Sequence, residues 1–218
     1  FVLINLARKD LLFFLLPCDM RFVPIVASLL LVLLMTPVGS SAGWHRGKVT
    51  DKVYFNVTVD GGEPQGRIVF GLFGEQSPKT VKNFIELSTG EHGFGYQGSL
   101  FHKIIHKLYV EGGDFERGDG TGGYSIYNKQ PFDDETNDIA PFVGSLGMLN
   151  HGPHTNQAQF WIQTGLDVAH MFHEHRLVFG KVLEGMMLLK RLCRLEVDID
   201  SKPLQKIRIE KSGRLVEG

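Results

Sequence analysis

A stretch rich in glycine constrains this 218-residue chain more than any other. The first half of residues 101–123 is mainly apolar, as expected for a pair of strands that line a core, and residues 112–123 include six glycines. Glycines at this density are needed where the backbone takes a positive φ or passes close to another group. A buried strand that leads into a tight loop containing Asp114, Glu116 and Asp119 predicts the rim of a groove.

The overall composition is that of an ordinary globular protein. The chain is 43% apolar and 22% charged, with a net charge of −1, which argues against disorder. This balance gives no electrostatic support for nucleic acid as a partner. One domain is therefore expected once the front of the chain is set aside.

Residues 1–42 are expected to be a leader segment in which Met20 is the true start. Arg21, an apolar run over residues 26–35 and small residues ending at Ala42 follow Met20, a pattern typical of a secretory signal peptide. We expect cleavage after Ala42, a domain over residues 43–218, no membrane attachment after cleavage, and a location in the endoplasmic reticulum lumen or outside the cell. The alternatives are an uncleaved anchor, although a span needs ~20 apolar residues, and a longer leader that starts before Met20.

Hydrophobic periodicity predicts an all-β fold with two helices. Ser77 and Pro78 indicate the start of a helix that ends at Gly90. A second helix is expected over residues 186–192. Strands are expected over residues 53–59, 67–73, 144–150, 159–164, 177–183 and 204–209, and a strand pair in the first half of 101–123. We expect these strands to close into a barrel, because closure leaves no bare edge.

Two patterns resemble other kinds of site only superficially. Residues 118–123 fit a dinucleotide-binding pattern, but no helix signal follows them and the neighbouring acids would repel pyrophosphate. His170, His173 and His175 fit no standard zinc spacing. We therefore expect neither a cofactor nor a metal.

A series of short motifs resembles the cyclophilin family of cyclosporin-binding peptidyl-prolyl isomerases, over about residues 49–211. The motifs are Phe70-Gly71-Leu72-Phe73, Pro78-Lys79-Thr80-Val81, Asn83-Phe84, Gly93-Phe94-Gly95-Tyr96, Phe101-His102, Gly112-Gly113-Asp114-Phe115, Arg117 to Gly122 and Val178-Phe179-Gly180-Lys181-Val182. With the signal peptide, the chain is similar to secretory-pathway members of the cyclophilin B type. The resemblance implies a closed eight-stranded antiparallel barrel capped by two helices. It also implies proline-containing client polypeptides as partners, and we expect a monomer.

The resemblance also implies a set of catalytic residues. Rotation about an X–Pro bond has a barrier of ~18–20 kcal/mol, since amide resonance is lost, and family members lower it with an arginine beside a glutamine and an asparagine. Lys103 lies at the position of the arginine, Glu111 at that of the first glutamine, and Gln159 and Asn150 keep the second glutamine and the asparagine. Lysine keeps the charge but loses the two aligned donors of arginine.

The substrate pocket implied by the resemblance is substituted at most positions. Its residues would be Leu108, Tyr109, Leu149, Trp161, Met171, Phe172 and Arg176. Met171 takes the position of a rim tryptophan, so we expect weakened cyclosporin binding. Trp161 is interpreted as a pocket wall, with a place in the core as the alternative. We therefore expect a divergent active site.

Three functional hypotheses follow from this combination of family motifs and altered pocket. The first is a working isomerase that accelerates X–Pro isomerisation during protein folding in the secretory pathway. The second is a catalytically impaired member that serves as a proline-peptide-binding or chaperone module. The third is a structural barrel whose groove is blocked by Leu149 and Trp161.

Overall fold

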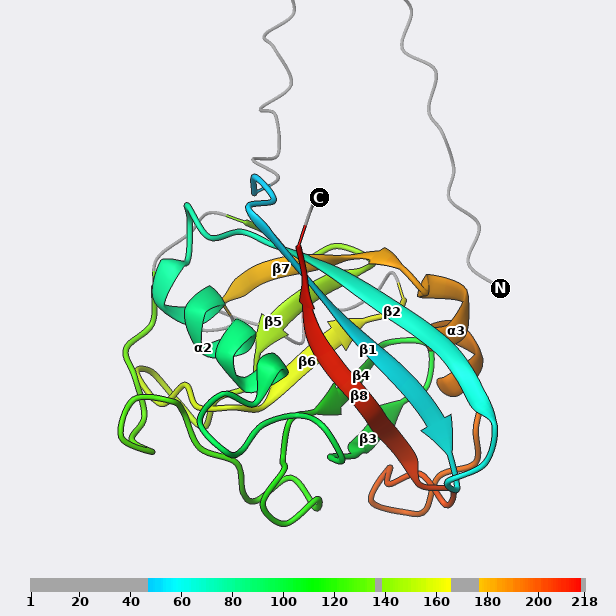
Figure 1. The fold of residues 1–218 in the computed structure, drawn as a ribbon. Helices are drawn as coiled ribbons and strands as arrows, with labels where there is room; N and C mark the ends of the chain where they lie inside the picture. Colours follow the sequence, from blue (N-terminus) through cyan, green and yellow to red (C-terminus); the bar gives the residue numbers. More distant parts are fainter. Residues whose placement is uncertain (1–46, 136–138, 166–176, 217–218) are drawn as a thin grey trace, which may run out of the picture. The chain divides into compact units, whose positions relative to one another are not determined.

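The structure is a computed structural model that describes residues 47–135, 139–165 and 177–216. Eight strands form one sheet, and every strand pairing in it is antiparallel (Figure 1). The elements are β1 (Asp51–Val59), β2 (Pro64–Leu72), α2 (Pro78–Thr89), β3 (Phe101–Ile105), β4 (Tyr109–Gly112), β5 (Ser145–Met148), β6 (Phe160–Gln163), β7 (Val178–Glu184), α3 (Met186–Leu192) and β8 (Ile207–Leu215). The order across the sheet is β3-β4-β6-β5-β7-β2-β1-β8. The prediction of a mainly β fold with two helices is confirmed.

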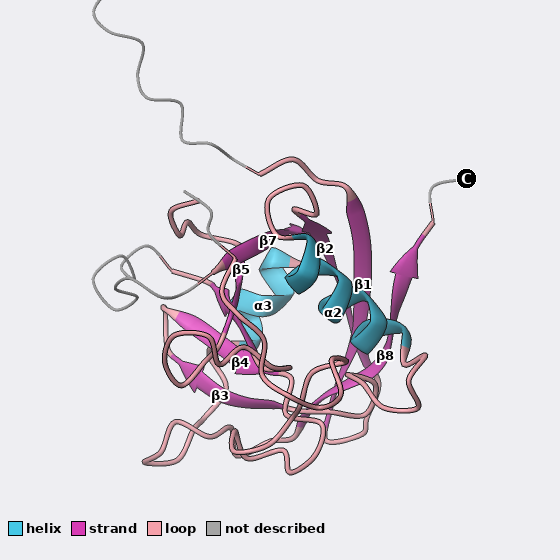
Figure 2. Cartoon of the chain, turned by 90° about the vertical axis from the view of Figure 1, so that its left-hand side faces the viewer, coloured by secondary structure: helices cyan, strands magenta, loops and turns pink. Residues whose placement is uncertain are grey.

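The core lies between the inner face of the curled sheet and the two helices (Figure 2). Alternate residues of β1 are buried, as a strand with period two requires, and Phe55 is one of them. The ring of Phe55 contacts those of Phe70, Phe84 and Tyr96, with ring centroids 5.1 to 5.8 Å apart. Because Phe84 comes from α2, this aromatic cluster fixes the helix against the sheet.

Helix α2 begins and ends where the sequence predicts, but its cap differs. Ser77 occupies the N-cap position and Gly90 ends the helix in a left-handed conformation, with φ of 71°. The capping carboxylate belongs to Glu135, which accepts the backbone N–H groups of Lys79 and Thr80 at 2.9 and 2.8 Å. An acidic group at this end also complements the helix dipole. A residue distant in sequence supplies the cap, so no local motif could have predicted it.

The predicted closed barrel is wrong. The sheet has two edge strands, β3 and β8, and the described residues connect them through one isolated bridge between Leu100 and Arg208 rather than a ladder. The chain reaches β3 through turns in which Gly95 and Gly98 have positive φ, so it is not extended where a ladder would have to form. The fold is a curled half-barrel.

The edge of β3 is nevertheless covered. The backbone N–H of Ile104 donates a hydrogen bond of 2.9 Å to the carbonyl of Ser201. Ser201 belongs to the loop before β8, which therefore lies against the outer edge of β3. Covering an edge by a loop is a common alternative to closure, and here it also brings residues 198–202 beside the strand that carries Lys103.

Candidate functional site

The glycine-rich loop after β4 is folded around the carboxylate of Asp114, which is 1% exposed. The two carboxylate oxygens accept five backbone N–H groups at 2.8 to 3.1 Å. The donors belong to Glu116, Arg117, Asp119, Gly120 and Gly122. Burial acts to raise the pKa of Asp114, but these backbone hydrogen bonds outweigh it and hold the pKa well below its usual range. The predicted rim is thus a loop shaped by one buried carboxylate.

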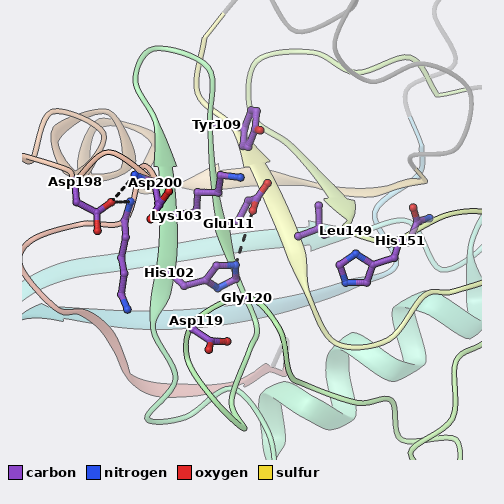
Figure 3. A pocket seen from close by; sticks show the side chains of 12 residues that line it. His102, Lys103, Tyr109, Glu111, Asp119, Gly120, Leu149, His151, Asp198 and Asp200 are labelled. Atoms are coloured by element: carbon purple, nitrogen blue, oxygen red, sulfur yellow. Dashed lines mark hydrogen bonds and ion pairs between the residues drawn. The ribbon is translucent and has the colours of Figure 1, made fainter.

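A cavity of about 540 Å³ lies beside this loop (Figure 3). Its walls come from β3 and β4, from the glycine loop, from the segment after β5 and from the loop before β8. The predicted residues that line it are Lys103, Tyr109, Glu111, Leu149 and Asn150. Asp119 and Gly120 come from the glycine loop that was predicted to form the rim of a groove, and the lining residues that sequence reasoning missed are His102, His151, Asp198, Asp200 and Lys202. The volume is within the range of ~300–1,000 Å³ typical of ligand sites.

Lys103 and Glu111 face each other across the β3–β4 pair, because they are partners in its register. Side chains of directly opposed residues point to the same side of a sheet, here into the cavity. Glu111 is 6% exposed. The amino group of Lys103 has no ion pair or hydrogen bond with any other described side chain. The cation implied by the resemblance therefore lies in the cavity with its donors available to a ligand.

A β-bulge brings His102 into the same cavity. The register between β3 and β4 shifts between Phe101 and Lys103, so two consecutive side chains, those of His102 and Lys103, both line the cavity. Strict alternation would have directed His102 to the opposite face. The bulge is not readable from alternation in the sequence, which explains why this residue was missed.

The imidazole of His102 is buried and uncharged at neutral pH. Burial lowers its pKa from 6.5 to about 4. Neither ring nitrogen has a hydrogen-bond partner among the described residues, and Nε2 lies 3.8 Å from Oε2 of Glu111. A buried polar group of this kind calls for an explanation, and one consistent with its place is a role toward a ligand in the cavity.

Gln159, predicted to be catalytic, is positioned under the glycine loop. It is 5% exposed, and its Nε2 donates to the carbonyls of Gly120 and Gly122 at 2.9 and 2.8 Å. Its Oε1 is buried without a hydrogen-bond partner among the described residues. The amide thus holds the backbone that forms one wall of the cavity, and Gln159 is not one of the lining residues.

Trp161 is the register partner of Glu111 on β6 but is not one of the residues that line the cavity. Its side chain is fully buried, and Nε1 donates to the carbonyl of Met148 at 3.1 Å. The indole packs in a second apolar cluster with Tyr109, and Leu108 and Leu149 pack against the edge of this cluster. The structure therefore places Trp161 as support for Tyr109 and Leu149, which do line the cavity.

Asn150 follows β5 in the chain and lines the cavity. Its Nδ2 donates to Oδ1 of Asn156 at 3.3 Å. Asn156 is fully buried and donates in turn to Asp134 and to the carbonyl of Phe132. A chain of hydrogen bonds through the buried Asn156 therefore orients Asn150.

Three predicted substrate-binding residues lie outside the described ranges. They are Met171, Phe172 and Arg176. His170, His173 and His175, whose spacing fits no standard zinc pattern, lie there as well. Among the described residues, no group of three or more His, Cys, Asp or Glu side chains could hold a metal ion, and no helix is long and apolar enough to cross a membrane.

The fold and the site define a class of mainly antiparallel β domain with a polar cavity beside one edge of its sheet. Residues 54–214 match the family described as cyclophilin-type peptidyl-prolyl cis-trans isomerase/CLD. Because the match covers well over half of the chain, the protein belongs to the cyclophilin family. Membership supports an isomerase activity on X–Pro bonds and the binding of proline-containing peptides.

Proposed function

We propose that the protein is a working peptidyl-prolyl isomerase whose divergent groove uses Lys103 as its cation. The observation that carries this proposal is the amino group of Lys103, which lines the cavity without a side-chain partner among the described residues. Isomerisation needs no nucleophile or metal, only stronger binding of the twisted amide than of the planar one. A cation near the twisted amide provides that difference, and Asn150, which also lines the cavity, would hold the peptide backbone.

The experiment is exchange NMR on an X–Pro peptide in the presence of a protein fragment of residues 43–218. This fragment contains the compact unit that spans residues 44–218. Faster cis–trans exchange that disappears in Lys103→Ala is the expected result. Uncatalysed exchange takes tens of seconds or longer, so a catalysed rate is measured directly. Peptide binding without faster exchange would overturn the isomerase and leave a recognition module.

The recognition module is the second candidate, and two observations favour it. The amide of Gln159 is already bonded to the carbonyls of the glycine loop. Lys103 also lacks the rigid fork of an arginine. Loss of an oriented donor can reduce a rate by ~10²–10³. A measured rate is therefore needed to distinguish a weak isomerase from a chaperone module.

We further propose a secretory-pathway setting of the cyclophilin B type, in which the protein acts as a monomer on folding clients. Support comes from the apolar run over residues 26–35 and the small residues before Gly43. The test is to express the full chain in a secretory cell and to sequence the N-terminus of the mature protein. A first residue at Gly43 is expected, and retention of residues 20–42 in the mature protein would contradict cleavage.

A further inference from the structure

The cavity beside Lys103 carries an excess of acidic side chains. Four of its lining residues are Asp or Glu and two are Lys, although the chain as a whole is nearly balanced, with 24 acids and 23 basic residues. The acids are Glu111, Asp119, Asp198 and Asp200. Hydrogen bonds from the side chain and backbone of Thr121 lower the pKa of Asp119 and so favour its charged form.

One acidic wall is preorganised. In the loop before β8, Oδ1 of Asp198 accepts the backbone N–H groups of Asp200 and Lys202, both at 2.9 Å. Asp198 also exchanges backbone hydrogen bonds with this loop, and the N–H of Ile104 on β3 bonds the carbonyl of Ser201. The loop is therefore fixed both internally and against the strand of Lys103. A rigid charged wall loses little conformational freedom when a ligand binds.

The buried floor of the cavity indicates a ligand as well. The side chain of His102 is 3% exposed and lies within 3.8 Å of Glu111, and its ring nitrogens have no hydrogen-bond partner among the described residues. A neutral imidazole has one nitrogen that accepts a hydrogen bond. An ammonium or guanidinium group can donate to that acceptor beside the negative charge of Glu111, whereas a carboxylate there would be repelled by Glu111.

We propose that the groove selects X–Pro segments that carry a lysine or arginine within three residues of the proline. This inference rests on the function proposed above and specifies its substrate class. A cavity of about 540 Å³ is on the order of 8 Å across, which an extended chain crosses in two to three residues at ~3.3 Å each. A basic side chain at that separation reaches Asp200 while the proline lies near Lys103.

The test compares peptides that are identical except for Lys, Gln or Glu at one position, moved from three residues before the proline to three after it. Exchange NMR measures kcat/KM for each peptide with residues 43–218, at low and at high ionic strength. At one or more positions, kcat/KM for the Lys peptide should exceed kcat/KM for the Glu peptide on the order of tenfold, and the value for the Gln peptide should lie between them. High salt should reduce the difference.

Two variants remove the same charge from different places. Asp200 is exposed, its side chain has no hydrogen bond or ion pair with a described residue, and it lines the cavity. Glu210 is an exposed acid on β8 that does not line it. Asp200→Asn should reduce the Lys-to-Glu ratio at least twofold, and Asp200→Lys should invert it, while Glu210→Gln should leave the ratio unchanged.

The outcomes separate the inference from the function on which it rests. Equal acceleration of all peptides would overturn the inference and leave the isomerase standing. If no peptide is accelerated, the isomerase is overturned, and dissociation constants for the same peptides then decide the inference. Tighter binding of the Lys peptides that is lost in Asp200→Asn would sustain it, and binding independent of the peptide charge would refute it.

Discussion

The resemblance aligns Lys103 with an arginine of the family, and in the proposed function this residue limits the rate of isomerisation. Arginine presents two parallel donors in a fixed plane, whereas lysine presents a flexible point charge. Lys103→Arg is therefore expected to raise kcat/KM about tenfold, because one oriented donor is worth at least that much. Exchange NMR provides the measurement. Lys107→Arg, outside the cavity lining, is the matched control, and an unchanged rate in Lys103→Arg would show that the cation does not limit catalysis.

The carboxylate of Asp114 organises the glycine loop, so its removal should lower the free energy of unfolding. Asp114→Asn keeps the size of the side chain but removes the charge that accepts five backbone N–H groups. We expect a decrease of about 2–4 kcal/mol in the free energy of unfolding at pH 7, measured by urea denaturation. Glu210→Gln, on the exposed face of β8, should cost little.

The same residue predicts a pH dependence with a definite sign. Because the folded state holds the pKa of Asp114 below its usual range, its contribution is present above the unfolded-state pKa of ~3.9 and is lost as the pH falls below it. The difference in stability between the wild-type protein and Asp114→Asn should therefore shrink below about pH 4. A difference that stays constant down to pH 2 would contradict the assigned role.

His102 predicts a second effect of pH. Its folded-state pKa of about 4 lies below the ordinary value of 6.5, so the unfolded chain takes up a proton first as the pH falls. Stability should decrease between about pH 6.5 and pH 4 for this reason, and less so in His102→Gln. The imidazole resonances of His102 should titrate with a midpoint near pH 4, and a midpoint near 6.5 would show that the ring is solvated.

At the scale of elements, β5 and β6 support the cavity through one close contact. A methyl group on Gly147 would overlap the indole ring of Trp161, which is its register partner. Gly147→Ala should therefore cost about 1–3 kcal/mol by overpacking, and Trp161→Phe about 1–3 kcal/mol by leaving a void. The double variant should cost clearly less than the sum, since the smaller ring makes room for the methyl group. Additive costs, from urea denaturation, would exclude this direct coupling.

The helices and strands were largely predictable because their signals come from residues that are close together in the sequence. Alternation of apolar residues in β1 and β2, and the Ser77–Gly90 helix signals, depend on nearby residues alone. The closed barrel was wrongly predicted because closure depends on the glycine turns before β3. Likewise, the cap from Glu135 involves residues more than fifty positions apart, and such contacts have no local pattern.

The candidate site was predictable only in part, again for a physical reason. Motif positions identified Lys103, Glu111 and Asn150, which the structure brings to one cavity. His102 depends on a bulge in the strand register. The acidic wall at residues 198–202 depends on a loop that covers the β3 edge from a distant part of the chain. A register shift and a tertiary contact leave no periodic signal in the sequence, so both were missed.

At the scale of the whole molecule, the fold depends on its last strand. β8 pairs along β1 and contributes Ile207 and Ile209 to the core. A chain that ends at Lys206 should therefore not fold, which a collapsed amide dispersion in NMR would show. A synthetic peptide of residues 207–216 should restore dispersion when added, because it supplies the missing edge. A folded chain without β8 would contradict this dependence.

The pairing of β1 with β8 also imposes an order in time. Asn56 is paired with Lys211, 155 residues later (211 − 56), and synthesis at ~5–20 residues per second separates the two strands by about 8–30 s. During that interval β1 can pair with β2 but presents its other edge unprotected. The pairing of β1 with β8 is therefore the last strand pairing of the described sheet to become possible, and a chain cut short within residues 185–206 would carry an exposed, pairing-competent edge.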